Sequence, residues 1–427
     1  MSDRLSVSQG FEDFSSDIHP DSTSEDRHWF AILKNNFRYS FFNESDSLLS
    51  GLLAYSRVSF RPPRTPTVLL GKMFPETEDV RELEARFEQE FREIIWCTYR
   101  SGFEAIRRIE EGELKAEYTS DVGWGCTLRV GQMLIANCMK RLSSRQQAIA
   151  DILETPSAAF SVHRLVEIGD RHLDRRAGDW YAPSAVCHAL KYLVDETGRD
   201  DVGFLVAMDG CIYHDQVYSA ASGLPIQTFR LPCRCEKKAR REEPSPDTDE
   251  YELFDLEASE CTVCLQPLTA AQWTKPLLLT VPLMLGLGQV NTEYYEAVKF
   301  FLRLPQSAGI IGGRPKSALY FIGYQGDSLV FLDPHYVQKT CGRDWTSPTY
   351  TCSRANLLRL RDAESSMSVA FYVESLGSYE SLCTAILQAE ELTRKVMSVQ
   401  SRTPGYLLGE DLPVQHEDRD FIVIDRI

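Results

Sequence analysis

The sequence predicts an α+β protein in which one central helix packs against an antiparallel sheet. A turn built on Gly123 and Gly125 leads into a helical pattern of apolar residues that runs to Leu142. Two β-rich runs flank residues 325–327, which is typical of a hairpin. A nearly continuous apolar run over 277–285 is typical of a buried strand. A chain of 427 residues with 43% hydrophobic residues can bury one large core or two modest ones.

The other expected elements follow from the same periodicities, read in chain order. They are a strand over 68–72, a helix over 78–96, helices opening at Thr155 and at Pro183, a helix over 291–302, a strand over 368–373 and a closing helix over 379–399. Proline at the first helical position favours the starts at Pro156 and Pro183, and the first of these helices is expected to reach His172.

The charge and the hydropathy of the chain restrict its partners and its compartment. The net charge of −16 argues against nucleic acid or an anionic membrane as the main partner, because both would repel the protein. The sequence contains no run of eighteen apolar residues, and its first residues lack the apolar region of a secretory signal. We therefore expect a cytoplasmic protein, in which twelve cysteines are compatible with reduced thiols.

Three segments are expected. Residues 1–66 form an N-terminal extension that is polar at its start and partly disordered, 67–400 form the folded domain, and 401–427 form a flexible tail. An insertion over 231–262 differs from its surroundings because it is first basic and then acidic. Charge segregation of this kind favours disorder.

The insertion also carries a candidate metal site. Cys233 and Cys235 open it, and Cys261 and Cys264 close it. A Cys-x-Cys pair and a Cys-x-x-Cys pair could together bind zinc, and the second pair has ordinary ligand spacing. The disordered alternative is favoured because Cys-x-Cys is uncommon and no histidine supports the set. We expect no metal and no cofactor.

Cys126 is the candidate nucleophile. The glycine turn places its thiol where the helical pattern begins, so unpaired backbone N–H groups and the positive end of the helix dipole face it. Both favour the thiolate, which is the nucleophilic form. The alternative is an inert, buried cysteine, the commoner state of a single cysteine in a soluble chain.

A second stretch, about two hundred residues later, supplies the base. The second strand of the predicted hairpin ends in Asp333, Pro334 and His335. Residues two apart in an extended chain point to the same side, about 6 to 7 Å apart. The aspartate can therefore orient the imidazole, and a base held in this way beside a thiol is the general plan of cysteine catalysis. Asp-Pro after a strand is also common in ordinary turns, so Asp-Pro-His alone is a weak indication of a catalytic site. It becomes a strong one together with the motif that contains Cys126.

With these motifs the chain resembles the autophagins, the papain-like cysteine peptidases of autophagy that process ubiquitin-like modifiers ending in glycine. The resemblance covers roughly 68–398 and keeps the family's order of motifs. The matching stretches are 119–126, 128–133, 178–183, 282–287, 309–315, 320–324 and 333–335. It implies a papain-like fold with a small α/β auxiliary subdomain at about 169–268.

The resemblance also implies site residues. Cys126, His335 and Asp333 would form the catalytic triad, and Tyr99 would lie beside the thiol. A phenol there could stabilise the oxyanion together with the backbone N–H of Cys126. Trp180 would line the cleft. The alternatives are a structural, buried tyrosine and a tryptophan that anchors the core.

By the same resemblance, residues 304–313 would form a mobile loop over the cleft. Pro305, Gln306 and Ser307 would gate the substrate, and the glycines that follow would supply the flexibility of a lid.

The implied activity is cleavage of the C-terminal extension of a ubiquitin-like modifier after a glycine, and release of the same modifier from phosphatidylethanolamine. The protein would act as a monomer and touch autophagosomal membranes through the lipidated substrate. A papain-like acyltransferase and a weakly active modifier-binding protein are the alternatives. The first would transfer the acyl group to an amine, and the second would keep the fold without efficient chemistry.

The C-terminal segment carries a candidate docking motif. Phe421 and Ile424, behind the acidic residues Glu417, Asp418 and Asp420, resemble the short motif that docks on autophagy modifiers. An extended segment can add to a sheet edge while two side chains fill pockets, and its acidic residues can meet a basic rim. The alternative is a terminal strand docked on the protein's own core.

Overall fold

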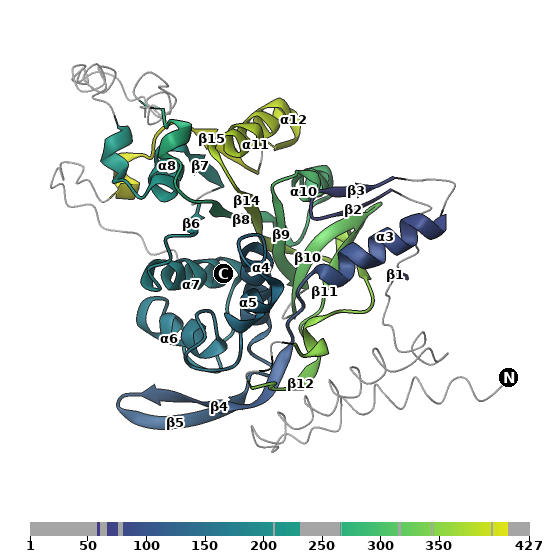
Figure 1. The fold of residues 1–427 in the computed structure, drawn as a ribbon, viewed down its shortest axis with the longest axis vertical. Helices are drawn as coiled ribbons and strands as arrows, with labels where there is room; N and C mark the ends of the chain where they lie inside the picture. The colour runs from purple at the N-terminus through teal and green to yellow at the C-terminus, as the bar shows by residue number, and fades with distance from the viewer. Residues whose placement is uncertain are drawn as a thin grey trace, which may run out of the picture.

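The computed structural model describes residues 58–59, 66–75, 80–207, 210–230, 265, 267–314, 317–342, 344, 346–393 and 396–408 (Figure 1). The insertion predicted over 231–262, the four cysteines in and beside it and the motif at Phe421 and Ile424 lie outside these residues, as does most of the N-terminal extension. The zinc and docking hypotheses therefore stay predictions.

A ten-stranded sheet runs through the centre of the described part of the chain. Its path is β1 (Val58–Ser59), β13 (Asn356–Arg359), β11 (Ser328–Leu332), β10 (Ser317–Gln325), β9 (Ser307–Arg314), β14 (Glu364–Val373), β8 (Leu277–Gln289) and β6 (Gly203–Val206), and β2 (Thr67–Leu69) pairs with both β10 and β3 (Lys72–Phe74). All pairs are antiparallel except β6 with β8. The expected hairpin and the buried strand from residue 277 are both present.

Helices and core residues cover both faces of the sheet. Along β10, Tyr320 and Ile322 join the core that contains α4 (Cys126–Met139), α6 (Val162–His172) and α7 (Pro183–Glu196). Leu319 and Phe321 join a second core, which contains α10 (Tyr295–Arg303) and α11 (Leu376–Gln388). Alternate side chains of one strand thus serve opposite layers, as the strand period requires. The predicted α+β class is confirmed.

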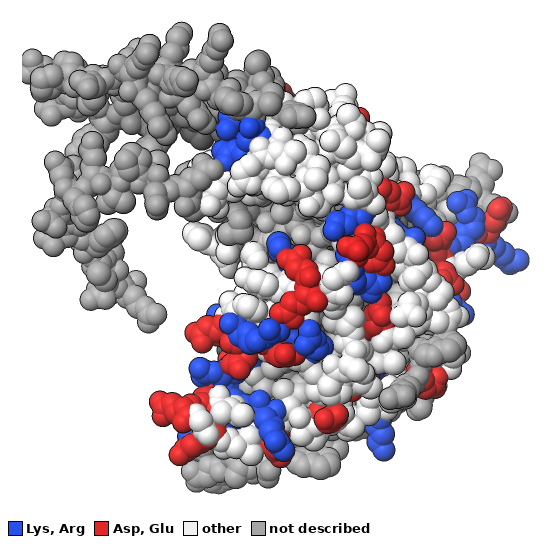
Figure 2. Space-filling view, turned by 60° about the vertical axis from the view of Figure 1, so that its left-hand side comes forward, with Lys and Arg blue, Asp and Glu red and all other residues white. Residues whose placement is uncertain are grey.

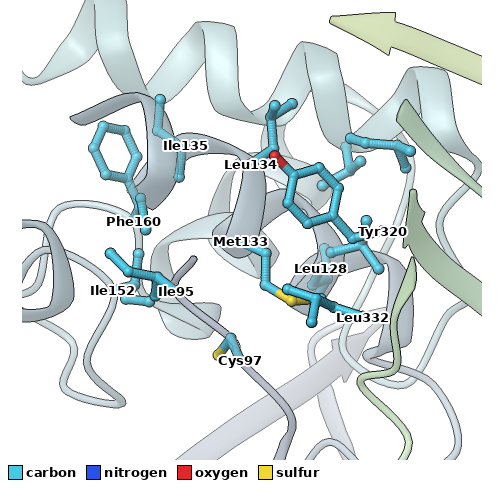
Figure 3. Packing of buried hydrophobic residues seen from close by; sticks show 14 of the residues in the cluster. Ile95, Cys97, Leu128, Met133, Leu134, Ile135, Ile152, Phe160, Tyr320 and Leu332 are labelled. Atoms are coloured by element: carbon cyan, nitrogen blue, oxygen red, sulfur yellow. The ribbon is translucent and has the colours of Figure 1, made fainter. Parts of the chain in front are cut away.

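Helix α4 lies at the centre of the first core, and every one of its residues is buried. Figure 3 shows Leu128, Met133 and Leu134 packed beside Tyr320 of β10 and Leu332 of β11. A helix that is buried on all sides must be surrounded by other elements. The layers that enclose α4 therefore hold Cys126 in one place relative to the sheet.

Two smaller sheets complete the described fold. β12 (Val337–Lys339) pairs in parallel with β4 (Tyr99–Glu110), which forms a long hairpin with β5 (Glu113–Ser120). This hairpin projects from the body of the protein (Figure 1). Pairing of Val337 with Tyr99 places the start of the hairpin next to His335. β7 (Cys211–Tyr213), just before α8 (His214–Ser222), pairs with β15 (Ser398–Gln400).

Of three expected helix starts in the first half of the fold, two are right and one is wrong. α3 (Val80–Glu93) and α7 begin close to the predicted residues, but α6 begins at Val162 rather than near Pro156. The Ser161 hydroxyl accepts the backbone N–H of Arg164 and caps the helix there. Before it, the backbone N–H of Phe160 donates to the Asp151 carbonyl at 2.7 Å, which closes the chain into turns. α5 (Arg145–Ala150) precedes those turns.

Two further predictions need correction. The closing helix ends at Gln388 and is followed by α12 (Glu390–Thr393) and by β15, so the helix does not reach residue 399. The single strand over 68–72 is a hairpin of β2 and β3, whose turn residues Leu70 and Gly71 have φ of 43° and 79°. Glycine accepts a positive φ without strain, which favours the turn.

The prediction of a mobile loop over 304–313 is wrong. Residues 307–314 form β9, a buried strand between β10 and β14 in the middle of the sheet. Its glycines serve close packing rather than flexibility. A Cβ on Gly309 would lie 2.7 Å from the Phe321 carbonyl, and one on Gly313 would lie 2.2 Å from that of Ser317. Gln306 donates from its amide to the Ser378 carbonyl at 3.0 Å, and Ser307 is 1% exposed, so neither lies open to a cleft.

The C-terminal end of the described chain is attached to the fold. The Thr403 hydroxyl donates to the Asp215 carboxylate at 2.7 Å, and Arg230 donates to the Thr403 carbonyl at 3.0 Å. The segment predicted to be a flexible tail from residue 401 is therefore held to the fold at its start. β6 belongs to the main sheet, so part of the expected auxiliary subdomain is continuous with it. None of the described helices is long and apolar enough to cross a lipid bilayer.

Candidate active site

A tight turn delivers Cys126 to the start of α4. The backbone N–H of Gly125 donates to the Asp121 carbonyl at 2.8 Å, and Gly123 has φ of +87°, which favours glycine. A Cβ on Gly125 would lie only 2.5 Å from the Asp121 carboxylate. Cys126 is then the first helical residue, as predicted, with Gly125 at the N-cap. The free N–H groups of the first turn therefore lie around the thiol.

A buried network of four charges supports this turn. Asp121 accepts from Arg129 Nε at 2.7 Å and from the backbone N–H of Arg100 at 2.7 Å. Arg129 also bonds Glu154 at 2.9 Å, and Arg100 Nε lies 3.5 Å from the same carboxylate. These side chains are fully buried, and the two cations balance the two anions. Removal of one member would leave an unpaired buried charge.

Asp121 and Arg129 both lie in the recognised motifs, but no pattern in the sequence pairs them. Their separation of eight residues crosses a turn and a helix start, so no periodic rule brings them together. Only the geometry of the turn does.

Asp333 and His335 lie side by side at the end of β11. The carboxylate of Asp333 lies 2.7 Å from His335 Nδ1 and accepts the backbone N–H of His335 at 3.0 Å. Trp96 donates from its indole N–H to the Asp333 carbonyl at 2.8 Å, and the N–H of Tyr99 donates to the Pro334 carbonyl at 2.9 Å. These bonds fix the imidazole so that Nε2 faces away from the carboxylate.

The thiol of Cys126 and the imidazole of His335 lie against each other, close enough for each group to shift the pKa of the other. Burial raises the pKa of the Cys126 thiol, but the hydrogen bond and charge of His335 outweigh it, and the pKa falls to about 7. Burial lowers the pKa of His335, but the charge of Asp333 and its hydrogen bond outweigh it, and the pKa rises to about 9. Between these values the pair is a thiolate and an imidazolium.

Two more groups contact the thiol. The Tyr99 hydroxyl and the backbone N–H of Ala318 both lie close to the sulfur of Cys126, and both lower the pKa of its thiol. The Tyr99 ring lies edge-on to the imidazole of His335, with 5.5 Å between centroids. Burial raises the pKa of Tyr99 well above its usual value, so the hydroxyl stays protonated and can donate. The predicted position of Tyr99 beside the nucleophile is the observed one.

Ala318 and Ser317 are contacts that sequence reasoning missed. Ser317 Oγ lies 3.4 Å from His335 Nε2, although eighteen residues separate the two in the chain. Ala318 uses its backbone, so no side-chain pattern could reveal its contact. Trp180 is 42% exposed on the connection from α6 to α7, which rules out the alternative of a core anchor.

The charge of its surroundings distinguishes Cys126 from other buried cysteines. Burial raises the pKa of Cys138 to about 12 and that of Cys187 to about 11, so both remain protonated thiols at neutral pH. Cys126 is just as closely surrounded, yet its pKa falls because an imidazolium faces it. The alternative of an inert, buried cysteine therefore describes Cys138 and Cys187 and does not describe Cys126.

Charged side chains of both signs lie interspersed on the face in Figure 2, with no broad basic area there. No cluster of three or more potential metal ligands occurs among the described residues.

Comparisons with known proteins agree with this chemistry. The model of the Peptidase C54 catalytic domain matches residues 84–385. A probable cysteine protease ATG4 of Meyerozyma guilliermondii is 29% identical over 74% of this chain and 72% of its own length. The cysteine protease ATG4B of Xenopus laevis is 30% identical over 77% of this chain and 80% of its own length. A cysteine protease ATG4 of Medicago truncatula is 29% identical over 73% of this chain and 61% of its own length.

Proposed function

This chain belongs to the Peptidase C54 family and is a cysteine protease, and we propose that Cys126, His335 and Asp333 are its catalytic triad. Its substrates are ubiquitin-like autophagy modifiers, which it cleaves after a glycine and releases from phosphatidylethanolamine. The observation that carries the residue assignment is the thiol of Cys126 beside the imidazole of His335, whose Nδ1 atom lies 2.7 Å from the Asp333 carboxylate.

In the first step the Cys126 thiolate attacks the carbonyl carbon of the modifier's glycine. The bond between sulfur and carbon forms while the carbonyl oxygen takes the negative charge. Tyr99 and the backbone N–H of Cys126 donate to that oxygen. The Tyr99 hydroxyl already reaches the sulfur in the free enzyme, so it needs little movement to reach an oxygen bonded to the neighbouring carbon.

Collapse of this intermediate releases the leaving group. The His335 imidazolium gives its proton to the departing amine, and a thioester with Cys126 remains. The neutral imidazole then takes a proton from water, which attacks the thioester and frees the glycine carboxylate. Asp333 holds the proton on Nδ1 throughout, so Nε2 is the nitrogen that exchanges protons.

The same site serves both leaving groups. A peptide extension and phosphatidylethanolamine both leave as amines, and the glycine side of the scissile bond is identical in the two substrates. Stabilisation of the transition state is therefore shared.

An exposed apolar surface beside the start of α7 suits the body of the modifier. A pocket of about 540 Å³ is lined by Ser184, Pro282 and Met284, among others. Met284 is 68% exposed and Leu287 fully exposed, which is unusual for large apolar side chains on a free surface and typical of an interaction site. Ser184 follows Trp180 by four residues, so this surface adjoins the cleft. We propose that Phe421 and Ile424 supply a second attachment.

The protein works in the cytoplasm as a monomer and meets autophagosomal membranes through its lipidated substrate. The charge of −16 leaves an anionic bilayer as a poor direct partner.

Mass spectrometry of a tagged modifier precursor tests the function. Incubation with the protein should give a product that ends at the glycine, and Cys126→Ala should give none while it still binds the precursor. A product that carries an added amine would instead identify a transferase. Precursor that stays intact with the wild-type protein would refute the proposal.

A further inference from the structure

Trp180 is exposed, yet the backbone before it is tightly held. Gly178, two residues earlier, has φ of +89°, and a Cβ there would lie 2.4 Å from the Tyr118 hydroxyl of β5. Only glycine permits this close approach of the connection between α6 and α7 to the β4–β5 hairpin. The hairpin is thus a support for the residues that carry Trp180.

Arg108 of β4 is the centre of this support. Its Nη1 atom donates to Asp179 Oδ1 at 2.6 Å and to the Ala177 carbonyl at 3.0 Å. Its Nε atom donates to Glu110 at 2.8 Å. One guanidinium therefore joins the hairpin to the residues directly before Trp180. Its side chain is 24% exposed and that of Asp179 31%, so the ion pair is partly shielded from water.

Arg176 closes the network from the other side. Its backbone N–H donates to Asp179 Oδ2 at 2.8 Å, and its Nη1 lies 3.3 Å from Glu110. Both oxygens of Asp179 are thus bonded, one to the hairpin and one to its own connection. Arg108 makes three directed hydrogen bonds at once, a geometry that the single ammonium of lysine cannot reproduce.

We infer that Arg108 is a positioning residue, which fixes Trp180 in the conformation that receives the C-terminal segment of the substrate. The inference rests on the proposed function and on the place in the cleft that the family resemblance implies for Trp180. A side chain held in its bound conformation loses little entropy on binding, whereas a mobile one must be ordered by the substrate. Arg108 therefore acts on substrate affinity without touching the reacting atoms.

Steady-state cleavage by Arg108→Ala tests this inference. We expect KM to rise about three- to tenfold, the range set by ordering one mobile side chain on binding, with kcat close to wild type. Arg107→Ala is the matched control. The neighbouring Arg107 is 68% exposed and pairs with Glu117 across the hairpin at 2.9 Å, so its bond stays within the hairpin and does not reach the connection that carries Trp180. Its KM should stay at the wild-type value.

Coupling to Trp180 separates positioning from a general structural role. In a Trp180→Ala background, Arg108→Ala should cause no further rise in KM, because the side chain that it positions is gone. Acrylamide should quench Trp180 more strongly in Arg108→Ala. Subtraction of the spectrum of the matching Trp180→Phe variant isolates that signal from the other tryptophans. Arg108→Lys should restore only part of the loss.

Several outcomes would overturn the inference. They are equal KM values for Arg108→Ala and Arg107→Ala, independent and additive effects of Arg108 and Trp180, or unchanged quenching of Trp180. The inference would also be overturned if Arg108→Ala lowers the melting temperature enough to explain the whole loss of activity. The proposed function survives each of these results as long as the wild type cleaves the precursor and Cys126→Ala does not. An unchanged KM in Trp180→Ala would remove both the cleft role of Trp180 and this inference.

Discussion

The proton shared by Cys126 and His335 sets the pH range of activity. Cleavage requires the thiolate, so the rate should rise as pH passes through about 7, the pKa of Cys126. It also requires the imidazolium for the leaving group, so the rate should fall above about 9, the pKa of His335. The two groups interact, so the limbs of the bell-shaped profile belong to the pair.

Asp333→Asn tests how the charge of Asp333 acts on the pKa of His335. Loss of the carboxylate charge lowers the pKa of His335. A less charged imidazole stabilises the thiolate less, so the pKa of Cys126 rises. The pH range over which the enzyme is active should therefore narrow from both sides. The pH dependence of alkylation by iodoacetamide, followed by mass spectrometry on the peptide that contains Cys126, measures the thiolate without substrate. If the pH dependence of alkylation is the same in Asp333→Asn as in the wild type, Cys126 and His335 are not coupled in the way assigned here.

Gly125 is required by the space around it. The Asp121 carboxylate, which a Cβ at Gly125 would meet, is held by Arg129 and by the backbone of Arg100, so it cannot move aside without losing buried bonds. Gly125→Ala should destabilise the protein by about 1–3 kcal/mol, as overpacking does, and reduce kcat by displacing Cys126. Denaturant unfolding and the cleavage rate measure the two effects.

A control glycine should respond in the opposite direction. Gly377 lies in α11 without a positive φ, and a Cβ added there would meet no described atom within 4 Å. Alanine there, in the first turn of the helix, should be neutral or stabilising by up to roughly 0.5–1 kcal/mol, because alanine loses less backbone entropy than glycine on folding. If Gly125→Ala and Gly377→Ala change the stability equally, a clash with Asp121 is not the reason for glycine at position 125.

At the scale of the element, β8 carries the apolar residues that we assign to modifier binding. Replacing both Met284 and Leu287 with serine should raise KM for the modifier precursor about tenfold or more, since interface hot spots exceed 1 kcal/mol each. The melting temperature should not fall, because both side chains are exposed. Leu387, 59% exposed on α11, provides the matched control: Leu387→Ser should leave KM unchanged. A fall in kcat alone would count against a docking role.

Elements with strong local signals could be predicted from the sequence, and others could not. The start of α4 at Cys126, the hairpin of β10 and β11 and the pairing of Asp333 with His335 each depend on residues that are close in the chain. The prediction for β9 fails because its glycines and its start after Pro305 are also typical of a loop. The glycines of β9 are needed because backbone carbonyls of β10 lie within about 3 Å of where the Cβ atoms of Gly309 and Gly313 would be. These contacts arise only in the folded protein.

The candidate site shows the same division. Cys126, His335 and Asp333 could be chosen by residue type, and Tyr99 and Trp180 by resemblance. Arg108, Asp121 and Arg129 act through contacts with residues that the chain brings from elsewhere, so only the folded geometry reveals them. The backbone N–H of Ala318 has no sequence signature at all.

At the scale of the whole molecule, two attachments to one substrate must be distinguished. The exposed residues of β8 belong to the described fold, while Phe421 and Ile424 lie thirteen or more residues beyond Leu408, the last described residue. A segment of that length can span up to about 40 Å when extended. Under the docking proposal the tail would hold a modifier while the cleft is still empty, and it would raise the local concentration of substrate without taking part in the chemistry.

Replacing both Phe421 and Ile424 with alanine should accordingly weaken modifier binding and slow cleavage at low substrate, while the rate at saturation stays close to that of the wild type. The effect should add to that of the β8 double variant, because the two attachments share no residue. Reversing the order of Phe421 and Ile424 keeps the composition and serves as the control for the motif. If the alanine variant instead loses thermal stability with unchanged modifier affinity, the terminal segment packs on the protein's own surface and the docking proposal fails.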